Sequence, residues 1–481
     1  MIDLHQWNTP TRSPNPPTAY FDEPSQAPVP TATQRCIGFF PEDTCMVEAE
    51  VKQQIFAPRS GDNLVNVNFG HALAFINDNI IAAATDGSAP GAGVHIFYKS
   101  DGMNAYDHFQ TLYGDQQNLV NNKFGYSLAT SKNTNTLIVG APSRNASDVK
   151  VDCVQQWCEL CSWSATDSTP CGERLDIIVQ SSTGDEDQIK QQIMTTGQCI
   201  ADEICNEVVT AGAVYIYEPT GSAWERVSIL TSDDPSFGSV VAMDEGVIAI
   251  GSPYQDKVTI YEKTGNSWTL LETKVSPAKG VKFGASLSLS GGALVIGAPL
   301  DGVGGVAYVY ARSARSFVPL GQPLVPRDIS PGDNFGEKVS VSGCTVAVSS
   351  SNDITASTTG TGSIRIFNYD YNLDYFSADQ IVEPTEDVTG VFPECLVMKG
   401  NDLLVGSSSG RSSGILTHFT RRNNVWTYKS VISNPHQDGG SAAGVFGCGL
   451  SISGSKALVG AKGTEQGPPG SSALCPDDEL I

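Results

Sequence analysis

Two acidic residues occupy equivalent places in the sequence and could together perform acid–base chemistry. Glu337 follows a Phe-Gly dipeptide, and Glu394 follows a related Phe-Pro dipeptide. When two carboxylates are held close together, the pKa of one rises and that group can act as a proton donor. The alternative is that both are ordinary polar residues lining a wet channel. The residues at the same place after the other Phe-Gly dipeptides are His71, Tyr126, Ser239, Ala285 and Cys448.

Support for catalysis elsewhere in the chain is thin. The sequence holds six histidines, and no G-x-S-x-G motif that would place a nucleophilic serine on a strained turn. The sequence therefore favours binding over turnover, with a hydrolase or lyase acting at the mouth of a channel as the alternative.

A cluster of six cysteines is the second group that could carry chemistry. One pair forms the C-x-x-C motif "CELC", which could bind zinc or act as a redox pair. The spacing of the cluster is irregular, however, and the segment holds neither a second C-x-x-C nor a histidine. A small subdomain held together by disulfides is therefore the favoured interpretation. The cysteines are Cys153, Cys158, Cys161, Cys171, Cys199 and Cys205.

The charge of the chain limits its partners. Its 29 basic and 52 acidic residues give a formal net charge of −23. Such a chain repels phosphate backbones, so nucleic acids and anionic membranes are excluded as favoured partners. No apolar run reaches the length of about 20 residues that spans a bilayer. The start of the sequence lacks the basic and apolar regions of a signal peptide, which favours an incomplete start.

A repeated dipeptide reveals the elements that must position these residues. Phe-Gly recurs with intervals of 55, 113, 46, 52, 57 and 54 residues, which indicates seven units and one insertion. The seven copies begin at Phe69, Phe124, Phe237, Phe283, Phe335, the degenerate Phe392, and Phe446.

Each unit predicts four short strands. The Phe-Gly strand is followed by a tight turn, a second apolar strand such as "LVIGAP", a Gly-led strand such as "GVAYVY", and a fourth strand often opened by an aromatic residue. A period near 50 residues with four strands is typical of a β-propeller blade. We therefore expect an all-β, seven-bladed β-propeller over residues 47–481, with a disulfide-rich insertion in blade two.

The glycines of this pattern have a second interpretation. In "FGASLSLSGGALVIGAP", Gly291, Gly292 and Gly297 surround a short apolar strand and could belong to a phosphate-binding turn. A phosphate site needs the free amides that begin a helix, and no helix is predicted after these glycines. We expect them in strand ends and a hairpin turn.

The repeated "FG…GAP" pattern resembles the FG-GAP repeats of the integrin-α N-terminal propeller and related secreted proteins. The resemblance covers roughly residues 47 to 475. In that family an Asp-rich loop between the first and second strands binds calcium. The corresponding turns here, such as "LSGG" and "VSGC", hold too few acidic residues for such a cage. We therefore expect neither calcium nor any other metal or cofactor.

The two ends of the chain are predicted to complete one blade. The last unit lacks a fourth strand, whereas residues 47–56 precede the first Phe-Gly and resemble an orphan fourth strand. Pairing residues 47–56 with the strand at 470–475 would remove two open sheet edges. It would also bring Cys45 near Cys475, which predicts a disulfide between them; pairing of Cys36 with Cys45 is the alternative.

The insertion, residues 145–207, is the main departure from the repeat. Between residues 148 and 207 it holds twelve acidic and three basic residues, a net charge of −9. One short helix is predicted from residue 184 to about residue 196. Asn145 begins the only glycosylation sequon. In the family, partners bind the face formed by the loops between second and third strands and between fourth and first strands. The insertion emerges there, and Trp157 and Trp163 are its candidate ligand contacts.

Together these observations predict a secreted or cell-surface module that binds a protein or glycan, preceded by a Pro-rich segment at residues 1–46. A structural protein of the cell surface or extracellular matrix is a further alternative.

Overall fold

The computed structural model describes 28 β-strands and no helix over residues 53–56, 69–85, 93–99, 105–114, 123–131, 133–145, 210–353, 362–370, 373, 375–383, 391–409, 412–433, 445–462 and 471–474. A membrane-spanning helix is likewise not found within these ranges. The Pro-rich segment 1–46, the predicted helix at residues 184–196, and both partners of the predicted Cys45–Cys475 bond lie outside them.

Six four-stranded sheets are each built from consecutive strands, paired antiparallel in chain order. The first three are β2 (Leu73–Asn77), β3 (Ile80–Ala84), β4 (Val94–Lys99), β5 (Tyr106–Leu112); β6 (Ser127–Ser131), β7 (Thr136–Asn145), β8 (Thr210–Thr220), β9 (Ala223–Ser232); and β10 (Val240–Asp244), β11 (Val247–Ser252), β12 (Lys257–Thr264), β13 (Ser267–Val275). The next three are β14 (Ser286–Ser290), β15 (Ala293–Ala298), β16 (Val306–Ser313), β17 (Ser316–Pro319); β18 (Phe335–Ser342), β19 (Thr345–Ser350), β20 (Ser363–Asp370), β21 (Tyr375–Val382); and β22 (Val391–Lys399), β23 (Asp402–Ser409), β24 (Ser412–Arg422), β25 (Val425–Ser433).

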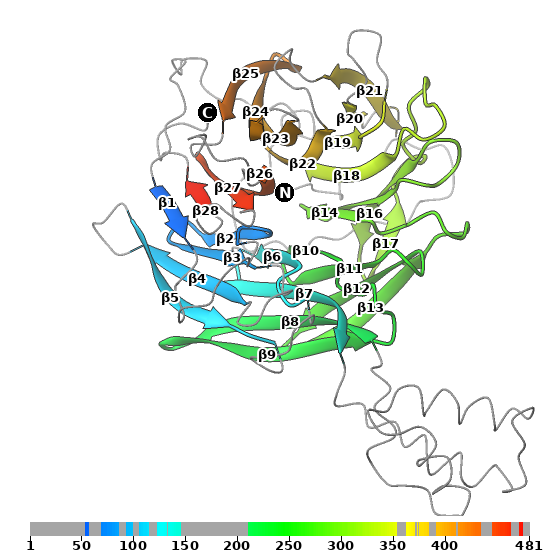
Figure 1. Ribbon diagram of the computed structural model, residues 1–481. Coiled ribbons are helices and arrows are strands. Elements are labelled where there is room, and N and C mark those ends of the chain that lie inside the picture. Colours follow the sequence, from blue (N-terminus) through cyan, green and yellow to red (C-terminus); the bar gives the residue numbers. More distant parts are fainter. Residues whose placement is uncertain are drawn as a thin grey trace, which may run out of the picture. The chain divides into compact units, whose positions relative to one another are not determined.

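The remaining sheet combines both ends of the chain. Its order is β1-β28-β27-β26, from β1 (Gln53–Phe56), β28 (Ser471–Leu474), β27 (Lys456–Lys462) and β26 (Val445–Ser453). β1 pairs antiparallel with β28, with Gln53 opposite Leu474 and Phe56 opposite Ser471. Figure 1 shows β1 in blue beside β28 in red. Joining the termini in one sheet covers two edges that would otherwise expose unpaired backbone groups.

The predicted fold class therefore needs correction. Seven blades were predicted, whereas the structure has six blades of consecutive strands, and the remaining four-stranded sheet is a composite of both ends of the chain. The predicted disulfide-rich insertion is not part of the fold as described, because all six of its cysteines lie outside the described residues.

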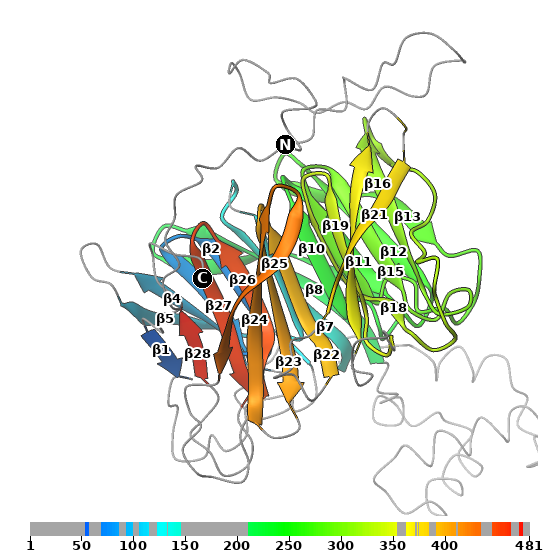
Figure 2. The ribbon, with the colours of Figure 1, turned by 90° about the horizontal axis from the view of Figure 1, so that it is seen from above.

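The chain divides into two compact units. Unit 1 comprises Met1–Ser143 and Gly212–Ile481, and unit 2 is Arg144–Ala211. Within unit 1 the sheets follow one another around a ring, with β2, β6, β10, β14, β18, β22 and β26 innermost (Figure 1). Figure 2 shows the strands running between the two faces of unit 1. This is the arrangement of a β-propeller.

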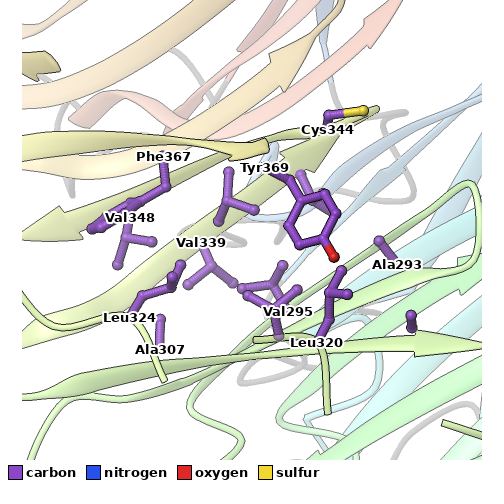
Figure 3. Close-up of a cluster of buried hydrophobic side chains, with 14 of the residues drawn as sticks. Ala293, Val295, Ala307, Leu320, Leu324, Val339, Cys344, Val348, Phe367 and Tyr369 are labelled. Atoms are coloured by element: carbon purple, nitrogen blue, oxygen red, sulfur yellow. The ribbon is translucent and has the colours of Figure 1, made fainter. Parts of the chain in front are cut away.

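The apolar core of unit 1 lies between successive sheets. The central strand β15 is buried along its whole length, as expected for a strand with a partner on each edge and a sheet on each face. Figure 3 shows one such cluster, in which Val295, Leu324 and Val339 point toward one another between neighbouring sheets. The Phe side chain of every Phe-Gly copy is at most 1% exposed: Phe69, Phe124, Phe237, Phe283, Phe335, Phe392 and Phe446.

The paired glycines that follow β14 form a hairpin turn. Gly291 and Gly292 join β14 to β15 and have φ angles of 56° and 75°. A two-residue hairpin with positive φ at both positions matches the right-handed twist of its strands, and glycine adopts it without strain. The structure thus places these glycines in a turn between strands, and no helix follows them.

Candidate functional site

The residues that follow the Phe-Gly dipeptides lie at the start of the innermost strands. Two of them, from neighbouring blades, come together: the rings of His71 and Tyr126 have centroids 5.3 Å apart and are tilted by 52°. The ammonium group of Lys123 lies 5.8 Å from the centroid of the Tyr126 ring. His71 and Tyr126 are therefore in contact across two neighbouring blades.

The two carboxylates are held differently. Glu337 is half-buried at the start of β18, and its Oε2 accepts a hydrogen bond from the hydroxyl of Ser351. Glu394 is half-buried on β22.

The other predicted site residues are not tested by this geometry. Trp157, Trp163 and the six cysteines of the insertion lie outside the described residues, as do Cys45 and Cys475. Asn145 is the last residue of β7, and its side chain is outside the description.

One face of unit 1 gathers two kinds of connection: those between the second and third strands of a sheet, and those that lead from a fourth strand to the next sheet. We call it the loop face. It includes residues 253–256, 276–282, 299–305 and 320–334. These loops bond to one another through their backbones. Leu300 N donates to Val281 O at 3.2 Å, and Leu324 in a further loop exchanges two hydrogen bonds of 3.1 and 2.7 Å with Ala307 on β16.

Buried aspartates anchor the loop face. Asp256 is 2% exposed, and its Oδ2 accepts the backbone N–H of Gly280 at 2.6 Å while its Oδ1 accepts that of Phe283 at 3.2 Å. Asp234 is fully buried, and its Oδ1 accepts both the N–H and the hydroxyl of Ser236 at 2.8 Å. A carboxylate that accepts such bonds satisfies loop amides that have no strand partner. These aspartates therefore fix the loops.

A second anchor surrounds a buried arginine. The Arg365 side chain is 10% exposed, and its Nη2 donates to Asp328 at 2.8 Å and to Asp353 at 3.2 Å. The hydroxyl of Ser363 also donates to Asp353, at 2.5 Å. Burial raises the pKa of Asp328, but the hydrogen bond and charge of Arg365 outweigh it, so that its pKa is lowered overall. This network joins the loop before β18 to the loop after β19.

Sequence reasoning missed these anchors. The partners of Asp256 are two amides of a later loop, and Asp234 is bonded to Ser236 two residues on, so neither belongs to a motif of catalytic or metal-binding residues. A signal does exist for Asp234, which precedes a Phe-Gly dipeptide by three residues. No group of three or more metal-ligating side chains occurs within the described ranges.

Large apolar side chains project from the anchored loops. Tyr254 is 76% exposed, Val303 is 63% exposed, and Leu300 and Val325 are 48% and 45% exposed. The backbone of Tyr254 is nonetheless fixed, because its N–H donates to the hydroxyl of Ser236 at 3.1 Å. Apolar groups on fixed loops lose little conformational freedom when a partner covers them, which favours binding.

The sheets and the loop face define the class of protein as a β-propeller. No protein-family model matches the chain, and no curated protein matches it. Among solved structures, a chain in the crystal structure of a mitotic checkpoint complex is 12% identical over 91% of this chain and 98% of that chain, with a TM-score of 0.49. The structure of U3-55K is 9% identical over 89% and 99%, with a TM-score of 0.47.

A third solved structure is similar to a smaller part of the chain. It is a 6-phosphogluconolactonase-like protein from Bacteroides fragilis, 10% identical over 76% of this chain and 84% of that chain, with a TM-score of 0.45. At such identities the likeness concerns the fold alone and carries no argument about ligand or activity.

Proposed function

We propose that this chain is a binding module of the FG-GAP type, similar to the integrin-α propeller, and that its loop face recognises a partner protein outside the cell. The observation that carries the proposal is the exposure of Tyr254, Leu300, Val303 and Val325 on loops whose backbones are fixed by buried aspartates. Exposed apolar groups on a rigid scaffold supply contact area at a low entropic cost.

The enzymatic alternative places a hydrolase or lyase at the channel mouth. It depends on Glu337 and Glu394 acting on one substrate. The hydrogen bond from Ser351 to Glu337 gives this carboxylate a structural role in its own blade. Glu337→Gln and Glu394→Gln should therefore leave partner binding unchanged. Loss of a detected turnover in either variant would favour the enzyme.

A photo-crosslinking residue placed at Tyr254 tests the proposal. The matched control is the same residue at Arg315, which is exposed in the β16–β17 turn on the opposite face. We expect one protein from a cell-surface extract to be captured from position 254 and not from 315. Capture should also weaken in the variant Val303→Ser. The same products from both positions, or none from either, would contradict binding by the loop face.

A further inference from the structure

On one part of the loop face the acidic side chains are bonded within the protein, whereas the basic side chains are exposed to solvent. Each acidic residue there is engaged by the protein itself. Asp256 accepts the amides of Gly280 and Phe283, and Asp301 Oδ2 accepts the hydroxyl of Tyr308 at 2.5 Å. Burial and this carboxylate raise the pKa of Tyr308, so the phenol keeps the proton that it donates.

Two acidic residues of these loops remain, and the first, Asp328, is paired with Arg365 at 2.8 Å. Its side chain is 60% exposed, but the guanidinium beside it offsets its charge. Asp333, which follows on the same loop, is buried and accepts the N–H of Ser330 at 2.7 Å. The acidic groups therefore contribute little negative potential to the outer surface.

The basic residues of the same loops face solvent. Lys279, Lys282 and Arg327 are exposed, and none of them forms an ion pair within residues 210–353, a stretch that the structure describes without interruption. In a chain with a net charge of −23, these loops therefore present a local excess of available positive charge.

The loops that carry these charges form one continuous surface. Asp256 holds the loop of Lys279 and Lys282 through Gly280, and Val281 in that loop bonds to Leu300. The loop of Leu300 continues to Gly304, whose carbonyl accepts the N–H of Phe335 at 2.8 Å. We call the exposed residues of this stretch the basic loop surface: Tyr254, Lys279, Lys282, Leu300, Val303, Val325 and Arg327.

We propose that the basic loop surface binds an acidic peptide segment that carries aromatic or aliphatic side chains, an inference that rests on the proposed binding function. Lys279, Lys282 and Arg327 would meet the carboxylates, which is the charge complementarity that steers partners together. Tyr254, Leu300 and Val303 would cover the apolar side chains.

The apolar residues decide between two acidic ligands. A sulfated glycan would satisfy the basic groups but has no side chains to cover three large exposed apolar residues. Those residues would then stay exposed in the complex, and the free energy of about 25 cal/mol per Å² of buried apolar area would not contribute to binding. An acidic peptide uses both kinds of group.

Three probes test the inference directly: a short peptide alternating Asp or Glu with Phe or Leu, the same peptide with Asn and Gln in place of the acids, and a heparin fragment. Fluorescence anisotropy with the full chain should detect the acidic peptide below about 1 mM. The double variant Lys279→Glu/Lys282→Glu should weaken it at least about tenfold. The matched control Arg315→Glu, on the opposite face, should leave it unchanged. Tyr254→Ser should weaken the peptide and leave any heparin binding as it was.

Four results would overturn the inference: no binding of the acidic peptide, equal binding of the amide peptide, equal loss in Arg315→Glu, or heparin binding with no effect of Tyr254→Ser on the peptide. Failure of the proposed function is distinguishable from these. If crosslinking at Tyr254 still captures a protein while Lys279→Glu/Lys282→Glu leaves that capture unchanged, the loop face binds a partner but the partner segment is not acidic.

Discussion

The α-carbon of Gly297 lies directly against the backbone carbonyl of Gly336 in the next blade. A Cβ added to Gly297 would lie 1.9 Å from that oxygen. The same oxygen accepts the hydroxyl of Ser286 at 2.8 Å. Gly297 begins the motif "GAP" of one repeat, and Gly336 belongs to the Phe-Gly dipeptide of the next. The "GAP" and Phe-Gly motifs of consecutive repeats therefore contact each other between neighbouring blades.

Replacing Gly297 with alanine should destabilise the protein strongly. The obstacle is a backbone oxygen, which cannot turn away as a side chain can, so the cost should reach about 3 kcal/mol or more. Gly265→Ala is the control: its Cβ meets nothing within 4 Å, and its φ of 62° predicts strain of only about 1 kcal/mol. Urea unfolding of both variants measures the difference. Equal losses would show that the blades adjust to an added methyl group.

This contact shows why the fold could be predicted from the sequence more fully than the site. Periodicity places Phe283 and Gly297 at strand ends, because each repeats at a nearly constant interval and a propeller is the usual result. The contact between Gly297 and Gly336 needs coordinates, since nothing in either motif states which blades are adjacent. The pairing of Glu337 with Glu394 stays a prediction, because equivalent positions in a repeat do not determine how their side chains point.

The aspartates that anchor the loop face could not be predicted from the sequence either. Asp256 has partners 24 and 27 residues away, and both are backbone amides, which leave no trace in residue types. The sequence likewise does not indicate that Tyr254, two residues before Asp256, is exposed. The closing pair, β1 with β28, was accessible because one repeat lacked a fourth strand and an extra strand preceded the first repeat.

Removing the Asp256 carboxylate should free a loop without unfolding a sheet. In Asp256→Ala the amides of Gly280 and Phe283 lose their acceptors, which should cost about 1–3 kcal/mol. Hydrogen exchange at Gly280 should accelerate more than exchange within β12 or β13. The control Asp233→Ala removes an exposed acidic residue and should change stability by less than about 0.5 kcal/mol. Unchanged exchange at Gly280 would show that Asp256 does not hold this loop.

Loss of Arg365 should cost far more stability than loss of its exposed partner Asp328. Arg365→Leu leaves Asp353, whose side chain is 11% exposed, without a countercharge and should destabilise the protein by about 3–5 kcal/mol. Asp328→Asn removes a side chain that is 60% exposed, where solvent screens the ion pair, and should cost less than about 1 kcal/mol. Thermal unfolding of both variants provides the comparison. A larger loss of stability in Asp328→Asn than in Arg365→Leu would contradict this prediction.

Acid should destabilise the protein through a buried histidine. Burial, and then the nearby charge of His108, lower the pKa of His95 from 6.5 to about 3. His95 Nδ1 and His108 Nε2 each lie 3.0 Å from the hydroxyl of Thr111, and the rings of Phe69 and His95 have centroids 5.6 Å apart. Below pH 6.5 His95 binds a proton in the unfolded chain but not in the folded chain. The free energy of unfolding therefore decreases as the pH is lowered from 6.5 to about 3.

The size of this acid effect can be measured with one substitution. The slope is about 1.4 kcal/mol per pH unit, or about 2 kcal/mol between pH 6.5 and pH 5. His95→Gln carries no titrating group, so its loss of stability between pH 7 and pH 5 should be smaller than that of the native chain by about this amount. The pKa of His108 is lowered in the same direction, but this side chain is exposed and His108→Gln should have a smaller effect. Urea unfolding at both pH values compares the variants, and an equal pH effect in His95→Gln and the native chain would exclude His95 as the source.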